Sequence, residues 1–173
     1  LTDSAAAGTA LACGYKTYNT FVGIDENGAP VQSLTELAAE LGMATAVMST
    51  DKLVGATPAA FTAHAEDRND TSYISKSQQR MMKTCGTLLD CGLDGTKAYE
   101  KRVTDMLTKL EADPDGFFLM YEEGHIDKAS HKHDLQTTFD CMVRFNQVIA
   151  TCMEYAFYHP DTFVLITADH ETG

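Results

Sequence analysis

Short apolar runs alternate along this chain with longer helical patterns, and this alternation restricts the folds that the chain can adopt. The runs at 43–48, 117–121 and 163–166 are too short for helices, and the last is rich in branched residues, which predicts buried strands. Strands that alternate with helices form a mostly parallel sheet. We therefore expect an α/β fold, with a mostly parallel central sheet and helices on both faces.

Capping signals mark where the first helices begin and end. Residues 4–13 are rich in alanine and precede Gly14, a common helix stop. Residues 33–36 form a capping-box pattern. Thr57 and Pro58 are expected to open a further helix, with the threonine as its cap and the proline in its first turn.

Two more helices are expected further along, at 103–110 and 134–158, with the least patterned stretch of the chain, 67–96, before them. Within that stretch we interpret residues 69–96 as a surface excursion or the site of a deleted insertion. The residues of the long helix expected to face the core are Leu135, Phe139, Met142, Ile149, Cys152 and Ala156.

Length and charge limit the function classes. The 173 residues suit one domain with a sizeable core, and we treat 1–173 as that domain. A net charge of −12 argues against nucleic acid or an anionic membrane as a partner. It also opposes an anionic substrate unless metal cations reverse the sign locally. We recognise neither a transmembrane stretch nor a signal peptide in the sequence.

The five cysteines leave their redox state open. Cys85 and Cys91 flank a short loop and could form one bridge. Cys141 and Cys152 fall within an apolar helical stretch, and for these and Cys13 we favour buried thiols.

Two pairs of metal-type residues lie at the ends of expected elements. Asp169 and His170 follow the last apolar run, at the sheet edge where open α/β folds bind ligands, although a structural role is equally frequent for such a pair. Asp127 and His131 are four residues apart, so one helical turn would aim both at a single ion such as Zn²⁺. The alternative for this second pair is an exposed helix start.

Glu122 comes directly after an expected buried strand, where a carboxylate without a partner would be costly. Mg²⁺ is a natural partner for such an oxygen ligand. The neighbouring Glu123 is a competing candidate or simply faces solvent.

Ser4 stands at an expected helix start and has two interpretations. It is either an N-cap, a role that Asp3 can also fill, or a nucleophile favoured by a metal and the helix dipole. No Gly-x-Ser-x-Gly elbow surrounds it, which argues against an α/β-hydrolase triad. Arg68 suits bidentate binding of phosphate or carboxylate, or is a solvated loop residue.

Taken together, these segments resemble the alkaline phosphatase family and follow its order along the chain. The matching segments are Thr-Asp-Ser-Ala-Ala at 2–6, Lys-Thr-Tyr-Asn at 16–19, Ala-Thr-Pro-Ala-Ala-Phe at 56–61 with His64 and Arg68, residues 122–131, and Thr-Ala-Asp-His at 167–170. The resemblance implies hydrolysis of phosphate monoesters through a phosphoserine intermediate. It also implies an exported homodimer, periplasmic, extracellular or at the cell surface.

The resemblance further implies individual roles. Ser4 matches the serine that is phosphorylated during turnover, Arg68 the arginine that clamps phosphate, and Lys128 a lysine that reaches phosphate through water. The implied metal ligands are Ser4, Asp169 and His170 for one Zn²⁺, Asp127 and His131 for a second Zn²⁺, and Thr57 and Glu122 for one Mg²⁺.

Several departures from the family pattern qualify these roles. Gly55 stands where the family usually carries aspartate or histidine, so we expect a weak magnesium site and no carboxylate partner for Lys128. The family's remaining metal ligands, an aspartate before 2–6 and a histidine beyond 170, lie outside this sequence, and the stretch 68–122 is short. We therefore interpret the chain as a phosphatase incomplete at both ends. The alternatives are a related phosphodiesterase or phosphomutase, or an inactive truncated remnant.

Overall fold

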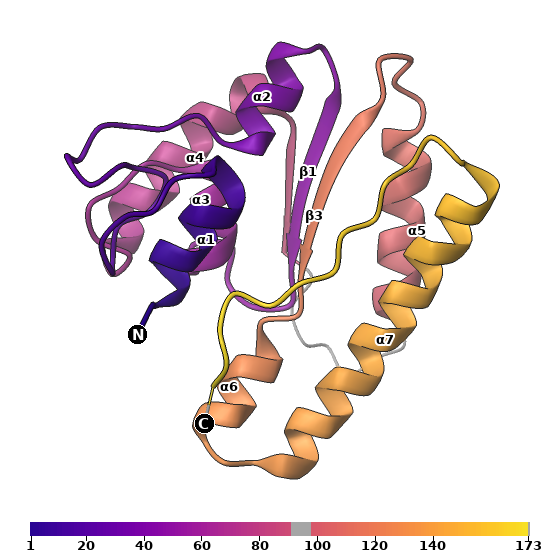
Figure 1. Ribbon diagram of the computed structural model, residues 1–173. Helices are drawn as coiled ribbons and strands as arrows, with labels where there is room; N and C mark the ends of the chain where they lie inside the picture. The colour runs from indigo at the N-terminus through magenta and orange to yellow at the C-terminus, as the bar shows by residue number, and fades with distance from the viewer. Residues whose placement is uncertain (91–97, 173) are drawn as a thin grey trace.

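The computed structural model describes residues 1–90 and 98–172 (Figure 1). Within this part of the chain, strand β1 (Ala44–Ser49) lies between β2 (Thr87–Asp90) and β3 (Phe117–Glu122), and both pairings are parallel. Ser49 pairs with Asp90 on one side and with Glu122 on the other, so the three strands end at one edge. The expected parallel sheet and α/β class are confirmed.

Helices lie on both sides of β1 (Figure 1), and neighbouring residues of the strand are buried in two different cores. Val47 is fully buried in a core with residues of α1 (Ser4–Cys13), α3 (Ala56–Thr62) and α4 (Thr71–Cys85). Met48 is fully buried in a second core that α5 (Ala98–Leu110) and α7 (Leu135–Tyr158) supply on the other face. Helices therefore cover both faces, because successive strand residues point to opposite sides of a sheet.

The caps of the first helices follow the expected chemistry with one exception. Gly14 ends α1 with a φ of 74°, and Ser33 with Glu36 forms the capping box of α2 (Leu34–Glu40). Helix α3, however, begins at Ala56, and Gly55 is its N-cap without a side-chain hydrogen bond. The expectation that Thr57 caps this helix is wrong, because its side chain bonds Glu122 instead.

The least patterned stretch contains α4 and β2. Asp70 caps α4 by accepting a hydrogen bond from the Tyr73 amide at 2.9 Å, and Ile74 is fully buried against the first core. Whether 69–96 replaces a longer insertion stays a prediction. The expected Cys85–Cys91 bridge involves Cys91, which lies outside the described residues.

The prediction of a third buried strand, at residues 163–166, is wrong. Residues 163–166 form no strand, and Figure 1 draws them as an extended trace between the end of α7 and α6 (His125–His131). Phe163 and Leu165 are 85% and 72% exposed, so no described element buries this apolar run. A buried strand needs both a hydrogen-bonded neighbour and cover for its side chains.

The buried line of α7 also differs from the expected one. Cys141 and Val148 are its buried residues, whereas Leu135, Phe139 and Met142 are exposed. The helix packs against α5 and α6, and of the expected core-facing residues Cys152 packs against the second core while Ile149 and Ala156 are partly buried, so the prediction is confirmed only for the C-terminal part of α7. Within the described residues, no helix has the length and apolar character needed to cross a bilayer.

Candidate active site

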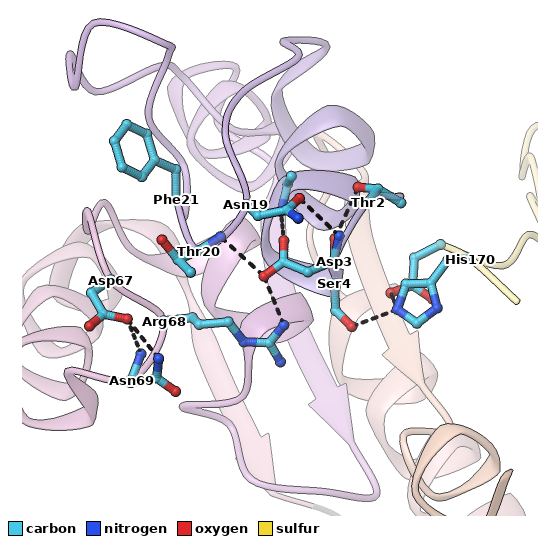
Figure 2. Close-up of polar contacts among 12 residues, drawn as sticks. Thr2, Asp3, Ser4, Asn19, Thr20, Phe21, Asp67, Arg68, Asn69 and His170 are labelled. Atoms are coloured by element: carbon cyan, nitrogen blue, oxygen red, sulfur yellow. Dashed lines mark hydrogen bonds and ion pairs between the residues drawn. The ribbon is translucent and has the colours of Figure 1, made fainter. Parts of the chain in front are cut away.

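Ser4 is the first residue of α1, and its hydroxyl contacts a histidine from the other end of the chain. Its Oγ lies 3.0 Å from His170 Nε2 (Figure 2). The N-cap is the neighbouring Asp3, whose Oδ1 accepts a hydrogen bond from the Ala6 amide at 2.9 Å. Because Asp3 does the capping, the Ser4 hydroxyl is not used as a cap, and the cap interpretation of Ser4 is wrong.

Arg68 is held beside this helix start rather than in solvent. Its Nη1 lies 3.1 Å from Asp3 Oδ2, which also accepts a hydrogen bond from the Thr20 amide at 3.1 Å (Figure 2). Burial raises the pKa of Asp3, but hydrogen bonds from Ala6, Arg68 and Thr20, with the Arg68 charge, hold it below its ordinary value. Asp3 is therefore an anion that fixes Arg68 next to Ser4.

A line of hydrogen bonds continues from His170 to α6. The ring Nδ1 of His170 lies 3.0 Å from the carbonyl oxygen of Glu171 and 3.3 Å from Thr172 Oγ1. The Thr172 hydroxyl donates to Asp127 Oδ1 at 2.6 Å. Since the Glu171 carbonyl can only accept, Nδ1 carries the proton in this arrangement and Nε2 accepts from Ser4. Thr172 was not predicted from the sequence, where its only signal is its place two residues after His170.

The metal-type pairs lie as their spacing predicts. Asp127 Oδ1 is 3.4 Å from His131 Nε2 on one face of α6, and Asp169 Oδ2 is 3.4 Å from His170 Nε2. His131 is the most open of the four, with 67% of its side chain exposed. Asp127, Asp169 and His170 therefore lie on the side of Ser4, linked to it through His170 and Thr172. His131 lies further out, toward solvent.

Glu122 ends β3 and is partly buried. The Ser49 hydroxyl donates to its Oε2, and Thr57 also bonds its carboxyl group. The net pKa of Glu122 is raised to about 7. Burial is the largest cause and raises it, the hydrogen bonds from Ser49 and Thr57 lower it, and the negative charges of Asp51 and Asp169 raise it further. A bound cation would relieve the cost of a partly buried carboxylate with two other carboxylates nearby.

Glu123 points elsewhere. It is buried, at 7% exposure, and its Oε1 accepts a hydrogen bond from Thr50 Oγ1 at 2.8 Å. The solvent-facing interpretation of Glu123 is therefore wrong. Burial raises its pKa, while Thr50 and the Arg144 charge lower it.

Lys128 has a carboxylate partner after all. Its Nζ lies 2.6 Å from Asp51 Oδ2, in the turn that follows β1. The expectation that Gly55 leaves Lys128 without such a partner is wrong. A Cβ at Gly55 would lie 2.8 Å from the Lys52 carbonyl oxygen, so a side chain there would require the turn to shift.

The donor chemistry fits divalent cations. Across residues 1–90 and 98–172, no group of three or more histidine, cysteine, aspartate or glutamate side chains is gathered as for a metal ion. The donors instead come in pairs. Imidazole with carboxylate, in Asp169 with His170 and in Asp127 with His131, suits Zn²⁺. The hydroxyl and carboxylate of Thr57 and Glu122 suit Mg²⁺, and the raised pKa of Glu122 favours a cation beside it.

Comparison with known proteins identifies the family of this chain. A family model described as alkaline phosphatase matches residues 1–99 and 89–173. The chain belongs to the alkaline phosphatase family. Two curated relatives from Bacillus subtilis (strain 168), alkaline phosphatase 4 and alkaline phosphatase 3, are 31% and 30% identical over 100% of this chain and 50% of their own lengths. The chain therefore spans about half the length of these relatives.

Solved alkaline phosphatases share the fold over the whole chain. A cold-active alkaline phosphatase from the psychrophile Shewanella sp. matches with a TM-score of 0.92 and 29% identity, covering 100% of this chain and 55% of the other. A TAB5 alkaline phosphatase mutant with Mg bound in its M3 site matches with a TM-score of 0.89 and 24% identity, covering 100% and 65%. At the latter identity the match supports the fold alone.

Proposed function

We propose that this chain carries the catalytic serine of a metal-dependent alkaline phosphatase. The observation that supports this most is the 3.0 Å contact between Ser4 Oγ and His170 Nε2 at the start of α1, with Arg68 held beside it. A nucleophilic hydroxyl, an imidazole and a guanidinium at a positive helix end form a site for a phosphate dianion.

Ser4 Oγ attacks phosphorus as the bond to the alcohol oxygen breaks, and the serine proton is lost as the alcohol gains one. Water then cleaves the phosphoserine, which releases inorganic phosphate and restores the hydroxyl. In both steps Arg68 binds the non-bridging oxygens, because its fixed guanidinium can donate two parallel hydrogen bonds. Lys128 adds a second positive charge, which we propose acts through water.

The proposal also includes three metal ions. Two zinc ions and one magnesium ion would be bound by Ser4 with Asp169 and His170, by Asp127 with His131, and by Thr57 with Glu122. When bound, such ions polarise phosphate oxygens and favour the deprotonated form of an attacking oxygen. They would also reverse the sign of an acidic site, so that a protein of net charge −12 can bind a phosphate dianion.

Phosphate monoesters are the proposed substrates. Arg68 beside Ser4 favours a terminal phosphate, whose charged oxygens it can pair, over a diester that has fewer of them. We include an exported homodimer in the proposal on the strength of the family relationship.

Hydrolysis of p-nitrophenyl phosphate by the zinc- and magnesium-loaded protein tests this function. Ser4→Ala should abolish turnover, while Ser72→Ala, at an exposed position of α4, should leave it unchanged. Bis(p-nitrophenyl) phosphate should be a poor substrate. Absence of turnover in the unaltered protein would support the inactive remnant instead, and preference for the diester would support a phosphodiesterase.

A further inference from the structure

The ion pair between Asp51 and Lys128 is a contact that the family pattern does not predict. Asp51 lies two residues after the end of β1, and its amide donates to Ser49 Oγ at 3.0 Å. Its Oδ2 lies 2.6 Å from Lys128 Nζ. The Asp51 side chain is 20% exposed and the Lys128 side chain 45%, so the pair has a partly buried acceptor and a more open donor.

Two glycines leave room for this carboxylate. A Cβ at Gly124 would lie 3.0 Å from the Cβ of Asp51. A Cβ at Gly55 would lie 3.7 Å from Asp51 Oδ2. Asp51 therefore lies next to Gly55. Gly55 is the position at which the family pattern usually has an aspartate or a histidine. The carboxylate that pairs with Lys128 thus comes from a residue four positions before Gly55.

We propose that Asp51 is a positioning residue that holds the ammonium group of Lys128 in place for phosphate. This inference rests on the proposed function, in which Lys128 assists phosphate binding. A lysine side chain has four flexible bonds, and Lys128 begins on α6 with nearly half of its surface open. A fixed, charged acceptor at 2.6 Å removes most of its alternative positions before phosphate binds, so less ordering is needed during binding.

A different role for Asp51 gives the opposite result. If Asp51 only balanced the positive charge of Lys128, removing its negative charge would strengthen the attraction of the site for an anion. Positioning instead predicts that phosphate binds more weakly without Asp51. The sign of the change therefore separates the two roles.

Calorimetric titration of inorganic phosphate into the metal-loaded protein tests the inference. Asp51→Asn should weaken phosphate binding by about two- to tenfold, the effect of leaving one long side chain to be ordered. The double variant with Lys128→Ala should bind no more weakly than Lys128→Ala alone. Asp51→Glu keeps the charge and should recover part of the affinity. Asp105→Asn, which breaks an exposed ion pair with Lys101 on α5, is the matched control and should have no effect.

Metal content of each variant, measured by mass spectrometry, separates positioning from loss of an ion. Positioning predicts unchanged metal content. Tighter phosphate binding in Asp51→Asn, an undiminished effect of that change in the Lys128→Ala background, or metal loss in step with affinity would each overturn the inference. Failure of the unaltered protein to bind phosphate would instead overturn the proposed function, and this inference with it.

Discussion

The two ends of the candidate active site differ in how firmly the chain itself holds them. At the serine end, Asp3 caps α1, accepts a backbone hydrogen bond from Thr20 and pairs with Arg68. At the α6 end, Asp127 and His131 contact each other at 3.4 Å, and their side chains are 38% and 67% exposed. The serine end is therefore fixed by several hydrogen bonds within the protein, whereas the α6 pair has one longer contact and is more open to solvent. We propose that a bound ion orders this outer pair.

Replacing Glu122 should have the largest effect on the stability of the metal-free protein. Its folded pKa of about 7 exceeds its ordinary value of 4.5, so stability falls as the pH rises from 4.5 through about 7. Above that range the charged group costs on the order of 3 kcal/mol, and Glu122→Gln should recover most of this at about pH 8. Urea unfolding with and without Mg²⁺ measures the effect.

The same experiment tests the metal assignment. Mg²⁺ should stabilise the unaltered protein and have much less effect on Glu122→Gln. Glu154→Gln, at an exposed position of α7, is the matched control and should change neither stability nor the response to Mg²⁺. Equal stabilisation of both proteins by Mg²⁺ would place the ion elsewhere.

Truncating Arg68 should have the next largest effect, on phosphate affinity. Loss of a charged hydrogen-bonded contact in Arg68→Ala is expected to cost about 1.5–3 kcal/mol of phosphate binding. The inhibition constant of inorganic phosphate measures it, with Arg80→Ala on the exposed side of α4 as the control. An unchanged inhibition constant in Arg68→Ala would mean that Arg68 only pairs with Asp3.

Removing the Asp3 side chain should affect stability and phosphate binding together. Asp3→Ala loses a helix cap, which costs about 1 kcal/mol, and also frees Arg68. Asp134 caps α7 in the same way, through the Thr137 amide at 3.0 Å, and lies outside the ligand pairs. Asp134→Ala should therefore lower stability without changing phosphate affinity. Equal phosphate affinity in the two variants would contradict the account of the serine end.

The smallest effect is expected from His64 and Glu36, a pair at 3.2 Å outside both ends of the site. Burial lowers the pKa of His64, but hydrogen bonds to Glu36 and the Gly23 carbonyl, with the Glu36 charge, raise it above 6.5 overall. Burial raises the pKa of Glu36, but bonds from His64 and Ser33 bring it below 4.5.

The pair should therefore stabilise the fold fully between pH 4.5 and 6.5. The contribution of His64 is lost as the pH rises through its raised folded pKa, and that of Glu36 as the pH falls through its lowered one. We expect less than about 1 kcal/mol, measured as the free energy of unfolding against pH. His64→Gln should remove the loss of stability that His64 contributes as the pH rises above 6.5. A pH dependence of His64→Gln above pH 6.5 that matches that of the unaltered protein would contradict this prediction.

Local chemistry made much of the fold and site predictable. The four-residue spacing of Asp127 and His131 places both on one face of α6, because it matches one helical turn. The capping box at Ser33 and the glycine after α1 fixed helix ends through backbone hydrogen bonds that depend on few neighbours. Strand ends at Ser49 and Glu122 meet because parallel strands share one direction.

Contacts made across the fold could not be predicted in this way. Asp51 contacts Lys128 because the turn after β1 lies beside Gly55 and Gly124. This contact depends on how separate segments pack together, which sequence spacing does not show. The apolar run at 163–166 suggested burial, but burial depends on a neighbour to cover it, and the described elements provide none. The apolar pattern did not predict helix α4, because most of its residues are polar and only Ile74 and Gln78 are buried.

The proposed mechanism requires that Ser4 becomes covalently phosphorylated. Incubation of the metal-loaded protein with labelled inorganic phosphate at acidic pH, followed by acid quench and peptide mapping by mass spectrometry, tests it most directly. We predict one phosphate on the peptide that contains Ser4, and none in Ser4→Ala or in protein stripped of metal. A stable phosphate on any other residue, or label that persists in Ser4→Ala, would contradict the account.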